Sequence, residues 1–270
     1  RKVLPESIAY GLTRQRNIGL QRAIYAVSRS KPEVVKKLLL AGVKHQLKGK
    51  VDMKHFTPSY DPWDQRLCVV PDGDLFKTLR SGQASIATDH IEKFTETGIQ
   101  LKSGQHLDAD IIVSATGLEI QIMGGIKASV DGKPLNTSEH MLYNGVMVSD
   151  VPNMAMVIGY VNASWTLKVD VVADYICRLF KYMDKNGFDE VIAPTDHSVM
   201  LNETVMGEMS SGYIARAADQ LPKQGSKAPW MATHNYLTDR KDLKNAKFSD
   251  GILKFSKLEK QAERKPKLVS

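Results

Sequence analysis

Residues 152–172, PNMAMVIGYVNASWTLKVDVV, decide the fold class predicted for this 270-residue chain. Met154 to Gly159 is an apolar run, which is typical of a short strand that is buried on both faces. Tyr160 to Ser164 is a tight polar turn, and Ser164 is suited to be the N-cap of a helix that follows it. A strand, a tight turn and a helix in this order indicate an α/β unit.

The helix after this turn is the most strongly patterned segment of the chain. Apolar side chains recur every four residues along it, and Asn186-Gly187 supplies a C-terminal stop. The expected stripe that faces the core consists of Leu167, Val171, Tyr175, Leu179 and Met183, widened by Ile176 and Phe180.

An earlier buried strand is predicted at Asp110–Gly117, where aliphatic residues precede Ser-Ala-Thr-Gly. Small strands are predicted at Ala84–Ala87, Ile91–Phe94 and Ile99–Leu101, separated by turns that contain Gly. Residues 119–150 hold many turn formers and are expected to be irregular. Strands and helices that alternate along the chain favour an α/β protein with a parallel sheet.

The beginning of the chain predicts two helices, at residues 5–29 and 32–47, the second with Pro in its first turn. An ordered loop rich in Pro and aromatic residues is expected at 52–64, and a short helix at 75–80. The last thirty residues are Lys-rich with few large apolar side chains, so they are expected to form a surface tail.

The composition is that of an ordinary globular protein, with 42% hydrophobic and 25% charged residues. No apolar run reaches the roughly 18 residues of a membrane span. The chain lacks a signal peptide and does not begin with Met, so an excised fragment is expected. Two cysteines without a C-x-x-C motif favour a reducing, cytoplasmic location. The seven histidines form no ligand pattern, so no metal site is predicted.

The net charge of +7 is unevenly distributed along the chain. Residues 1–50 hold twelve Lys or Arg against two Glu, and residues 240–270 hold ten against four acidic residues, so the middle is net acidic. A uniformly basic nucleic-acid binder has a different distribution, and no nucleic-acid partner is expected. The basic ends are interpreted as solvated helix faces, with weak contact to an acidic membrane surface as the alternative.

Three features of the sequence point to chemistry. The Ala-Thr-Gly end of the 110–117 strand would lie at the carboxyl edge of a sheet, where open α/β sheets bind ligands, although many buried strands end in small residues. The helix that begins at Trp165 offers an N-terminus that suits an anionic flavin, although a Trp there is as often a core or surface residue. Arg66 follows the rigid loop 61–65 and is suited to stabilise a developing oxyanion, although most arginines are solvated or paired.

Four stretches carry a resemblance to a known family: HFTPSYDPWDQRLCVVPDGDLF, DADIIVSATGLEIQ, PNMAMVIGYVNASWTLKVDVV and LPKQGSKAPW. They resemble class B flavoprotein monooxygenases of the Baeyer–Villiger type, and among them the bacterial ethionamide-activating subgroup. The resemblance extends from about Leu4 to about Tyr236. The Ala-Thr-Gly run is shared by many flavoproteins with two dinucleotide-binding domains, whereas DPWDQR and NASWT are much more specific.

The resemblance implies a role for four residues in the first part of the chain. Arg66 matches the active-site arginine, which supports the oxygenated flavin and its adduct with substrate. Gln65 falls where many relatives place a Lys that contacts the 2′-phosphate of NADPH, so the preference for NADPH over NADH stays open. Thr116 and Gly117 match the crossover between the nicotinamide and flavin domains.

In the second part of the chain, Asn162, Trp165 and Thr166 match the turn and helix start beside the flavin ring, and Trp165 is expected to face the substrate as well. The implied cofactors are FAD and NADPH. The implied reaction is reduction of FAD by NADPH and addition of O2 to give a flavin C4a-peroxide. One oxygen atom is then inserted into a ketone or transferred to the sulfur of a thioamide or thioether.

The resemblance also implies two Rossmann-like domains, one for FAD and one for NADPH, with a helical insert. The chain contains no G-x-G-x-x-G and no F-x-G-x-x-x-H-x-x-x-W fingerprint, so these loops are expected in a missing N-terminal half. The expected division is 1–60 for the helical insert of the NADPH domain, 61–118 for the remainder of that domain, 119–240 for the returning half of the FAD domain and 241–270 for a basic C-terminal tail.

Two other functions stay open at this point. A flavin-dependent disulfide or pyridine-nucleotide reductase is disfavoured by the absence of C-x-x-C and by the presence of Trp165 and Arg66. A non-catalytic truncated fragment would act, if at all, as a basic module that binds a membrane or a nucleic acid. The sequence alone does not identify the physiological substrate or the oligomeric state.

Overall fold

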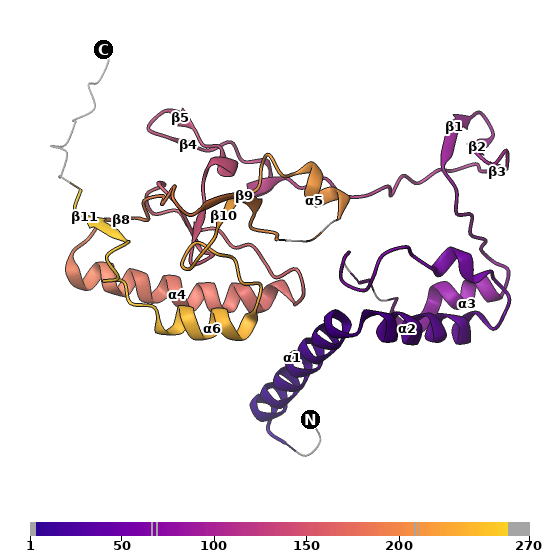
Figure 1. The fold of residues 1–270 in the computed structure, drawn as a ribbon, viewed down its shortest axis with the longest axis horizontal. Helices are drawn as coiled ribbons and strands as arrows, with labels where there is room; N and C mark the ends of the chain where they lie inside the picture. Colours follow the sequence, from indigo (N-terminus) through magenta and orange to yellow (C-terminus); the bar gives the residue numbers. More distant parts are fainter. Residues whose placement is uncertain (1–3, 66, 69, 208, 210, 259–270) are drawn as a thin grey trace, which may run out of the picture. The chain divides into compact units, whose positions relative to one another are not determined.

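The computed structural model describes residues 4–65, 67–68, 70–207, 209 and 211–258. It separates into two compact units, unit 1 at Arg1–Leu118 and unit 2 at Glu119–Ser270, and each is described by itself (Figure 1). Helices and strands occur in both units, so the mixed α/β character predicted from the sequence is confirmed.

The expected parallel sheet is not formed among the strands that the structure describes. All the described ladders are antiparallel: a three-stranded sheet in unit 1 and four two-stranded sheets in unit 2. Antiparallel pairs close through short turns, whereas parallel pairs need a long crossover that returns beside the first strand.

The helices of unit 1 agree with the predictions from the sequence. They are α1 (Glu6–Ser30), α2 (Pro32–Leu47) and α3 (Asp74–Arg80), with the 3₁₀ turns η1 (Met53–Phe56) and η2 (Pro71–Gly73). Pro32 occupies the first position of α2, where its missing N–H costs nothing. Lys48 ends this helix in the left-handed conformation, at φ 52°.

The sheet of unit 1 consists of β1 (Ile91–Thr95), β2 (Gly98–Leu101) and β3 (His106–Asp108), paired in that order. This confirms the strands predicted at 91–94 and 99–101, whereas Ala84–Ala87 is not a strand. A Cβ on Gly98 would lie 2.0 Å from the carbonyl oxygen of Leu107, so only glycine allows β2 and β3 to approach this closely.

The prediction of a strand buried on both faces at Asp110–Gly117 is wrong for this structure. The segment has no strand partner among the described residues, and Ile111 and Val113 are 83% and 82% exposed. A strand is stable only when neighbours receive its backbone hydrogen bonds and cover its faces, and unit 1 supplies neither here.

Unit 2 combines short hairpins with one long helix. Its elements before that helix are η3 (Ile122–Gly125), β4 (Ser129–Val130), β5 (Lys133–Pro134), η4 (Thr137–Glu139), β6 (Leu142–Tyr143) and β7 (Met147–Val148). The strand predicted at Met154–Gly159 is a half-buried extended segment instead, held by one bridge between Met147 and Ala155. The region 119–150, predicted to be irregular, nevertheless holds deeply buried residues, among them Met141, Val146 and Val148.

Helix α4 (Trp165–Asn186) confirms the stripe of five apolar residues predicted from the sequence, all of which are buried. Gly187 ends the helix in the left-handed conformation, at φ 65°. Phe180 was predicted to widen the stripe, but it is 59% exposed, and Lys168 and Val172 are buried in its place. The stripe drifts in this direction because an α-helix has 3.6 residues per turn rather than four.

The prediction that the last thirty residues form a surface tail is wrong for those that the structure describes. Helix α6 (Tyr236–Asn245) lies alongside α4, and β11 (Lys254–Ser256) pairs with β8 (Glu190–Ile192) (Figure 1). Few large apolar residues are present, but three of them are buried: Leu243, Phe248 and Leu253. The remaining elements of unit 2 are β9 (Met200–Thr204), α5 (Gly212–Arg216) and β10 (Lys223–Gly225).

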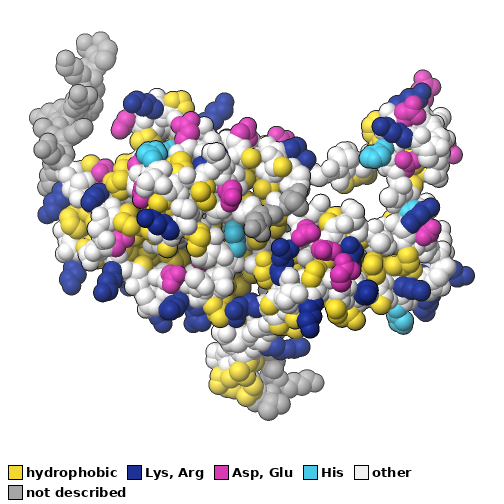
Figure 2. Space-filling model, viewed as in Figure 1, with side chains coloured by type: hydrophobic (Ala, Val, Ile, Leu, Met, Phe, Trp, Pro, Cys, Tyr) yellow, Lys and Arg dark blue, Asp and Glu magenta, His cyan; other side chains and the backbone are white. Residues whose placement is uncertain are grey.

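One face of the protein carries both signs of charge (Figure 2). On the face shown in Figure 2, Lys and Arg side chains are interspersed with Asp and Glu rather than gathered in one basic patch. Among the described helices, none is both long enough and apolar enough to cross a membrane.

Leu179→Ala is expected to lower the free energy of unfolding of unit 2 by about 2–5 kcal/mol, because it leaves a cavity under α4. The matched control is Phe180→Ala, which removes a larger but exposed side chain from the next position and should cost less than about 0.5 kcal/mol. Urea unfolding followed by circular dichroism measures both changes. Equal losses for the two variants would contradict the assigned core face.

Candidate functional site

The turn between the extended segment 154–159 and α4 is organised by the contact of Trp165 with Gly159. A Cβ built on Gly159 would meet the indole ring of Trp165 at 2.1–2.4 Å, so the ring lies directly against the backbone of the glycine. Trp165 is nevertheless 49% exposed. One part of the indole therefore packs on the turn, and the remainder is open to a ligand.

The first turn of α4 has no side-chain cap, although the N–H of Leu167 donates to the carbonyl oxygen of Ser164 over 3.2 Å. Ser164 has the extended backbone of an N-cap residue, but its hydroxyl is 2.7 Å from the Thr166 hydroxyl and caps no backbone N–H. Asn162 is half-buried, and Thr166 is exposed. Uncapped N–H groups at a helix start carry a partial positive charge, which suits an anionic or electron-rich group.

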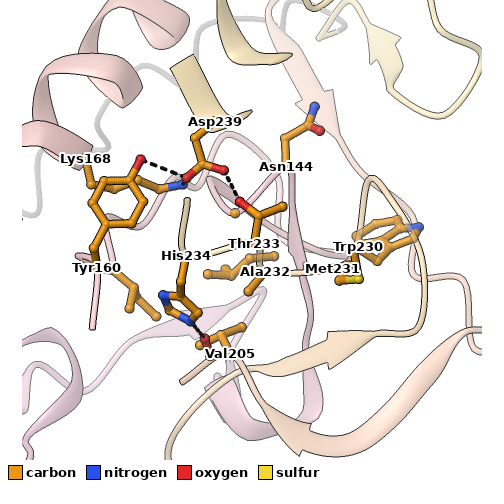
Figure 3. Close-up of a pocket in the computed structure, with 13 residues that line it drawn as sticks. Asn144, Tyr160, Lys168, Val205, Trp230, Met231, Ala232, Thr233, His234 and Asp239 are labelled. Carbon is orange, nitrogen blue, oxygen red and sulfur yellow. Dashed lines mark hydrogen bonds and ion pairs between the residues drawn. The ribbon is translucent and has the colours of Figure 1, made fainter. Parts of the chain in front are cut away.

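A buried ion pair joins α4 to α6 (Figure 3). Lys168 of α4 donates to Asp239 of α6 over 2.6 Å, and their side chains are only 8% and 11% exposed. Tyr160 donates its hydroxyl to the same oxygen of Asp239 over 2.9 Å, and Thr233 donates to the other oxygen. Burial, and then the neighbouring carboxylate, raise the pKa of Tyr160, so its hydroxyl stays protonated as a donor.

The ion pair borders a pocket of about 440 Å³, a volume that includes its open mouth. Apolar groups such as Ile158 and Met231 line it together with the polar side chains of Asn144 and His234. His234 lies 2.6 Å through Nε2 from the carbonyl oxygen of Val205, so Nε2 carries the proton of the neutral ring. Burial, as the main cause, lowers the pKa of His234.

In unit 1, ion pairs link the loop that precedes position 66 to the two long helices. Arg29 of α1 binds Asp64 over 2.9 Å, and Lys36 of α2 binds Asp61 over 3.4 Å. The hydrogen bond from Arg29 lowers the pKa of Asp64. Trp63 adopts a positive φ of 74° and packs edge-on against Tyr25 at 5.4 Å. A non-glycine residue in this conformation marks a loop that its surroundings hold in place.

The structure brings together only part of the predicted site. Asn162, Trp165 and Thr166 share one turn of unit 2. Thr116 and Gly117 lie in unit 1 on the exposed segment, with Gly117 at a positive φ of 132°.

Also in unit 1, Gln65 is half-buried, and its backbone forms an isolated β-bridge with Pro62. Arg66 lies outside the described residues. Unit 1 and unit 2 are described separately, so the roles of these residues stay predictions.

The residues of the buried network were missed from the sequence, although one signal was available. Lys168 falls one turn before Val172 on the face of α4 that packs into the core. A lysine in that position implies a buried charge, which requires a carboxylate partner. No sequence spacing identifies Asp239 as that partner, because it lies 71 positions away. Within the described part of the chain, no group of His, Cys, Asp and Glu is arranged to hold a metal ion.

Comparison with known proteins confirms the resemblance to flavoprotein monooxygenases. The probable FAD-binding monooxygenase AlmA of an Acinetobacter species is 71% identical over the whole chain, which covers 54% of that protein. The FAD-containing monooxygenase EthA of Mycobacterium tuberculosis is 46% identical over 94% of the chain. The putative FAD-containing monooxygenase MymA of the same species is 47% identical over 94%. The chain spans about half the length of each relative, and no family model matches it.

Gly159→Ala is expected to lower the free energy of unfolding by about 1–3 kcal/mol, because the new methyl group must displace the indole of Trp165. Trp165→Ala in the same chain should relieve most of this loss. Urea unfolding of the two single variants and the double variant gives the coupling energy directly. Additive effects would show that the two residues do not touch in solution.

Stability is expected to fall as the pH drops below 6.5, because the folded state holds His234 neutral while the unfolded chain binds the proton at its ordinary pKa of 6.5. His234→Gln should flatten this dependence, since Gln does not titrate. His197→Gln, at an exposed position, serves as the control and should leave the slope unchanged. Urea unfolding over a series of pH values measures how the free energy of unfolding depends on pH. If His234→Gln shows the same pH dependence as the native chain, His234 is not the group responsible.

Proposed function

We propose that this chain, which is homologous along its whole length to FAD-binding monooxygenases, is the flavin- and substrate-facing half of such an enzyme. The observation that carries the proposal is the turn 159–166, where an exposed indole and an uncapped helix start lie side by side. The identity to AlmA over the full chain supports the same conclusion.

The residues of this turn fit a flavin. Trp165 offers a flat, half-exposed ring, and the start of α4 offers backbone N–H groups without a side-chain cap. Asn162 and Thr166 add polar side chains beside them. These residues would hold the ring system of FAD, and FAD when bound supplies the redox and oxygen-transfer chemistry that no protein side chain provides. The chain's own part is to orient the cofactor and to keep water from it.

Arg66 is proposed as the catalytic residue in the loop of unit 1. Two ion pairs, to Asp61 and Asp64, link the preceding residues to α1 and α2. A guanidinium stays protonated at every working pH and donates to developing negative charge on oxygen. Gln65 would meet the nicotinamide cofactor, and Thr116 with Gly117 would form the crossover between the two cofactor domains.

The proposed reaction is NADPH-dependent transfer of one oxygen atom from O2 to a ketone, which yields an ester, or to the sulfur of a thioamide or thioether. The pocket next to the ion pair combines apolar groups such as Ile158 and Met231 with polar side chains such as Asn144, a mixture that is usual in sites for small organic molecules. The other oxygen atom of O2 leaves as water, and NADPH supplies the two electrons for this reduction.

The proposal includes a further half, upstream of the chain, that carries the glycine-rich phosphate loops. Two observations support it: the chain spans about half of its relatives, and Ile111 and Val113 lie exposed on a segment patterned as a buried strand. Strands of that half would pair with 110–117 and cover these side chains.

The test is co-expression of the chain with the complementary half of an AlmA-type relative. The complex should purify yellow and consume NADPH in the presence of an aryl ketone or a thioether. Arg66→Ala should keep the flavin spectrum but lose oxygenation by roughly 10²–10³-fold, as expected when one donor to a developing oxyanion is removed.

The chain purified alone is the control and should be colourless, because it lacks the phosphate loops. A colourless complex that does not consume NADPH would contradict the proposal. Binding of the chain to anionic lipid or DNA that weakens with salt would then favour the basic interaction module.

A further inference from the structure

The carboxylate of Asp239 binds the two residues that bracket the proposed cofactor turn. Tyr160 opens the turn, and Lys168 lies in the first turn of the helix that follows it. Both donate to the same Oδ2 atom, over 2.9 Å and 2.6 Å. Asn162 and Trp165 lie between them in the chain, so the segment 160–168 is a loop closed through a side chain of α6.

The surroundings of Asp239 are arranged to keep this closure in one geometry. Asn235 caps α6 by accepting from the N–H groups of Leu237 and Thr238, which sets the position of Asp239 one turn later. Thr233 donates to the second carboxylate oxygen. The carboxylate therefore accepts hydrogen bonds at both of its oxygens, and it cannot rotate without breaking one of them.

Lys168 is equally constrained. Its ammonium lies 5.5 Å from the centre of the Tyr160 ring. A Cβ on Gly145 would come within 3.2 Å of that ammonium, so a glycine there leaves the room the charge needs. Tyr160 and Lys168 thus contact each other as well as Asp239. Displacing either of them disturbs the contact of the other.

We propose that Asp239 is a positioning residue for FAD binding: it closes residues 160–168 into a loop and so sets where Trp165 and the start of α4 meet the cofactor. This inference rests on the proposed flavin site and adds to it a residue outside the site. Asp239 acts through Tyr160 and Lys168 and does not touch the cofactor itself.

A charged residue suits this task better than an apolar one. A buried ion pair gains little net stability over apolar packing, but it tolerates only one arrangement, because any shift leaves a charge without its partner. Tyr160 and Lys168, at the two ends of the turn, donate to the same carboxylate oxygen. A displacement of one donor therefore affects the hydrogen bond of the other. The main role of this network is to fix the position of the segment 160–168, not to raise the free energy of unfolding.

The first measurement is ¹⁹F NMR of the chain labelled with 5-fluorotryptophan, which gives one resonance for each of Trp63, Trp165 and Trp230. Asp239→Asn should shift and broaden the Trp165 resonance at a temperature where circular dichroism shows a folded protein. Trp63, in unit 1, is the internal control and should not change.

Two companion variants make this experiment decisive. Tyr160→Phe removes a single hydrogen bond and should move the Trp165 resonance in a protein that folds even if Asp239→Asn does not. Asp242→Asn removes an exposed carboxylate from the same helix and should leave the spectrum unchanged. A Trp165 resonance that is the same in Tyr160→Phe, Asp239→Asn and the native chain overturns the inference.

The second measurement is FAD affinity of the complex with the complementary half, by titration of flavin fluorescence. Asp239→Asn should weaken FAD binding about tenfold or more, since hydrogen bonds to a charged group are lost, whereas Asp242→Asn should not. If the native complex binds no FAD, the proposed flavin site is wrong, and the Trp165 resonance alone decides the role of Asp239. If it binds FAD and Asp239→Asn binds equally well, the flavin site stands and this inference fails.

Discussion

The ion pair between Lys168 and Asp239 is the constraint on which unit 2 depends. Two charges this deeply buried are costly unless they meet in good geometry and their remaining donors and acceptors are satisfied. Tyr160 and Thr233 meet that condition on the side of the carboxylate. Helices α4 and α6 therefore have one relative register, and the backbone that joins the extended segment to α4 has one path.

The apolar core around α4 supports this polar network. The buried stripe of α4 packs against residues that the sequence distributes over irregular connections, such as Met141 and Val146. Aromatic rings extend the same core towards the C-terminal region, with Tyr175 and Phe248 edge to face at 5.3 Å. Because α4 is anchored along its length, the exposed Trp165 and Thr166 at its start are held by a rigid support, which is what a binding site requires.

Helices could be predicted from the sequence because their signals are local. The apolar repeat of α4, the Pro of α2 and the glycine at position 187 each act within a few residues. The strands at 91–94 and 99–101 were also predicted, because a short turn joins them, but strands with distant partners could not be, because a strand depends on partners that its own residues do not specify. Met154–Gly159 gained one bridge and no ladder, and β11 was missed because its partner β8 lies more than sixty positions earlier. The network around Asp239 was missed for the same reason: the pairing of Lys168 is set by the fold.

The exposed segment 110–117 is the clearest case of a strand pattern without a strand partner. Its local pattern specifies burial, yet Ile111 and Val113 are largely open, and a conflict of this kind between sequence and surroundings is uncommon in natural proteins. A further sheet against this segment would remove the conflict, and the complementary half of the proposed monooxygenase would provide it. The same pairing would place Thr116 and Gly117 at a sheet edge, where their small side chains would let a cofactor approach the backbone. The feature that departs most from the sequence-based expectation is therefore the one that the proposed function explains most directly.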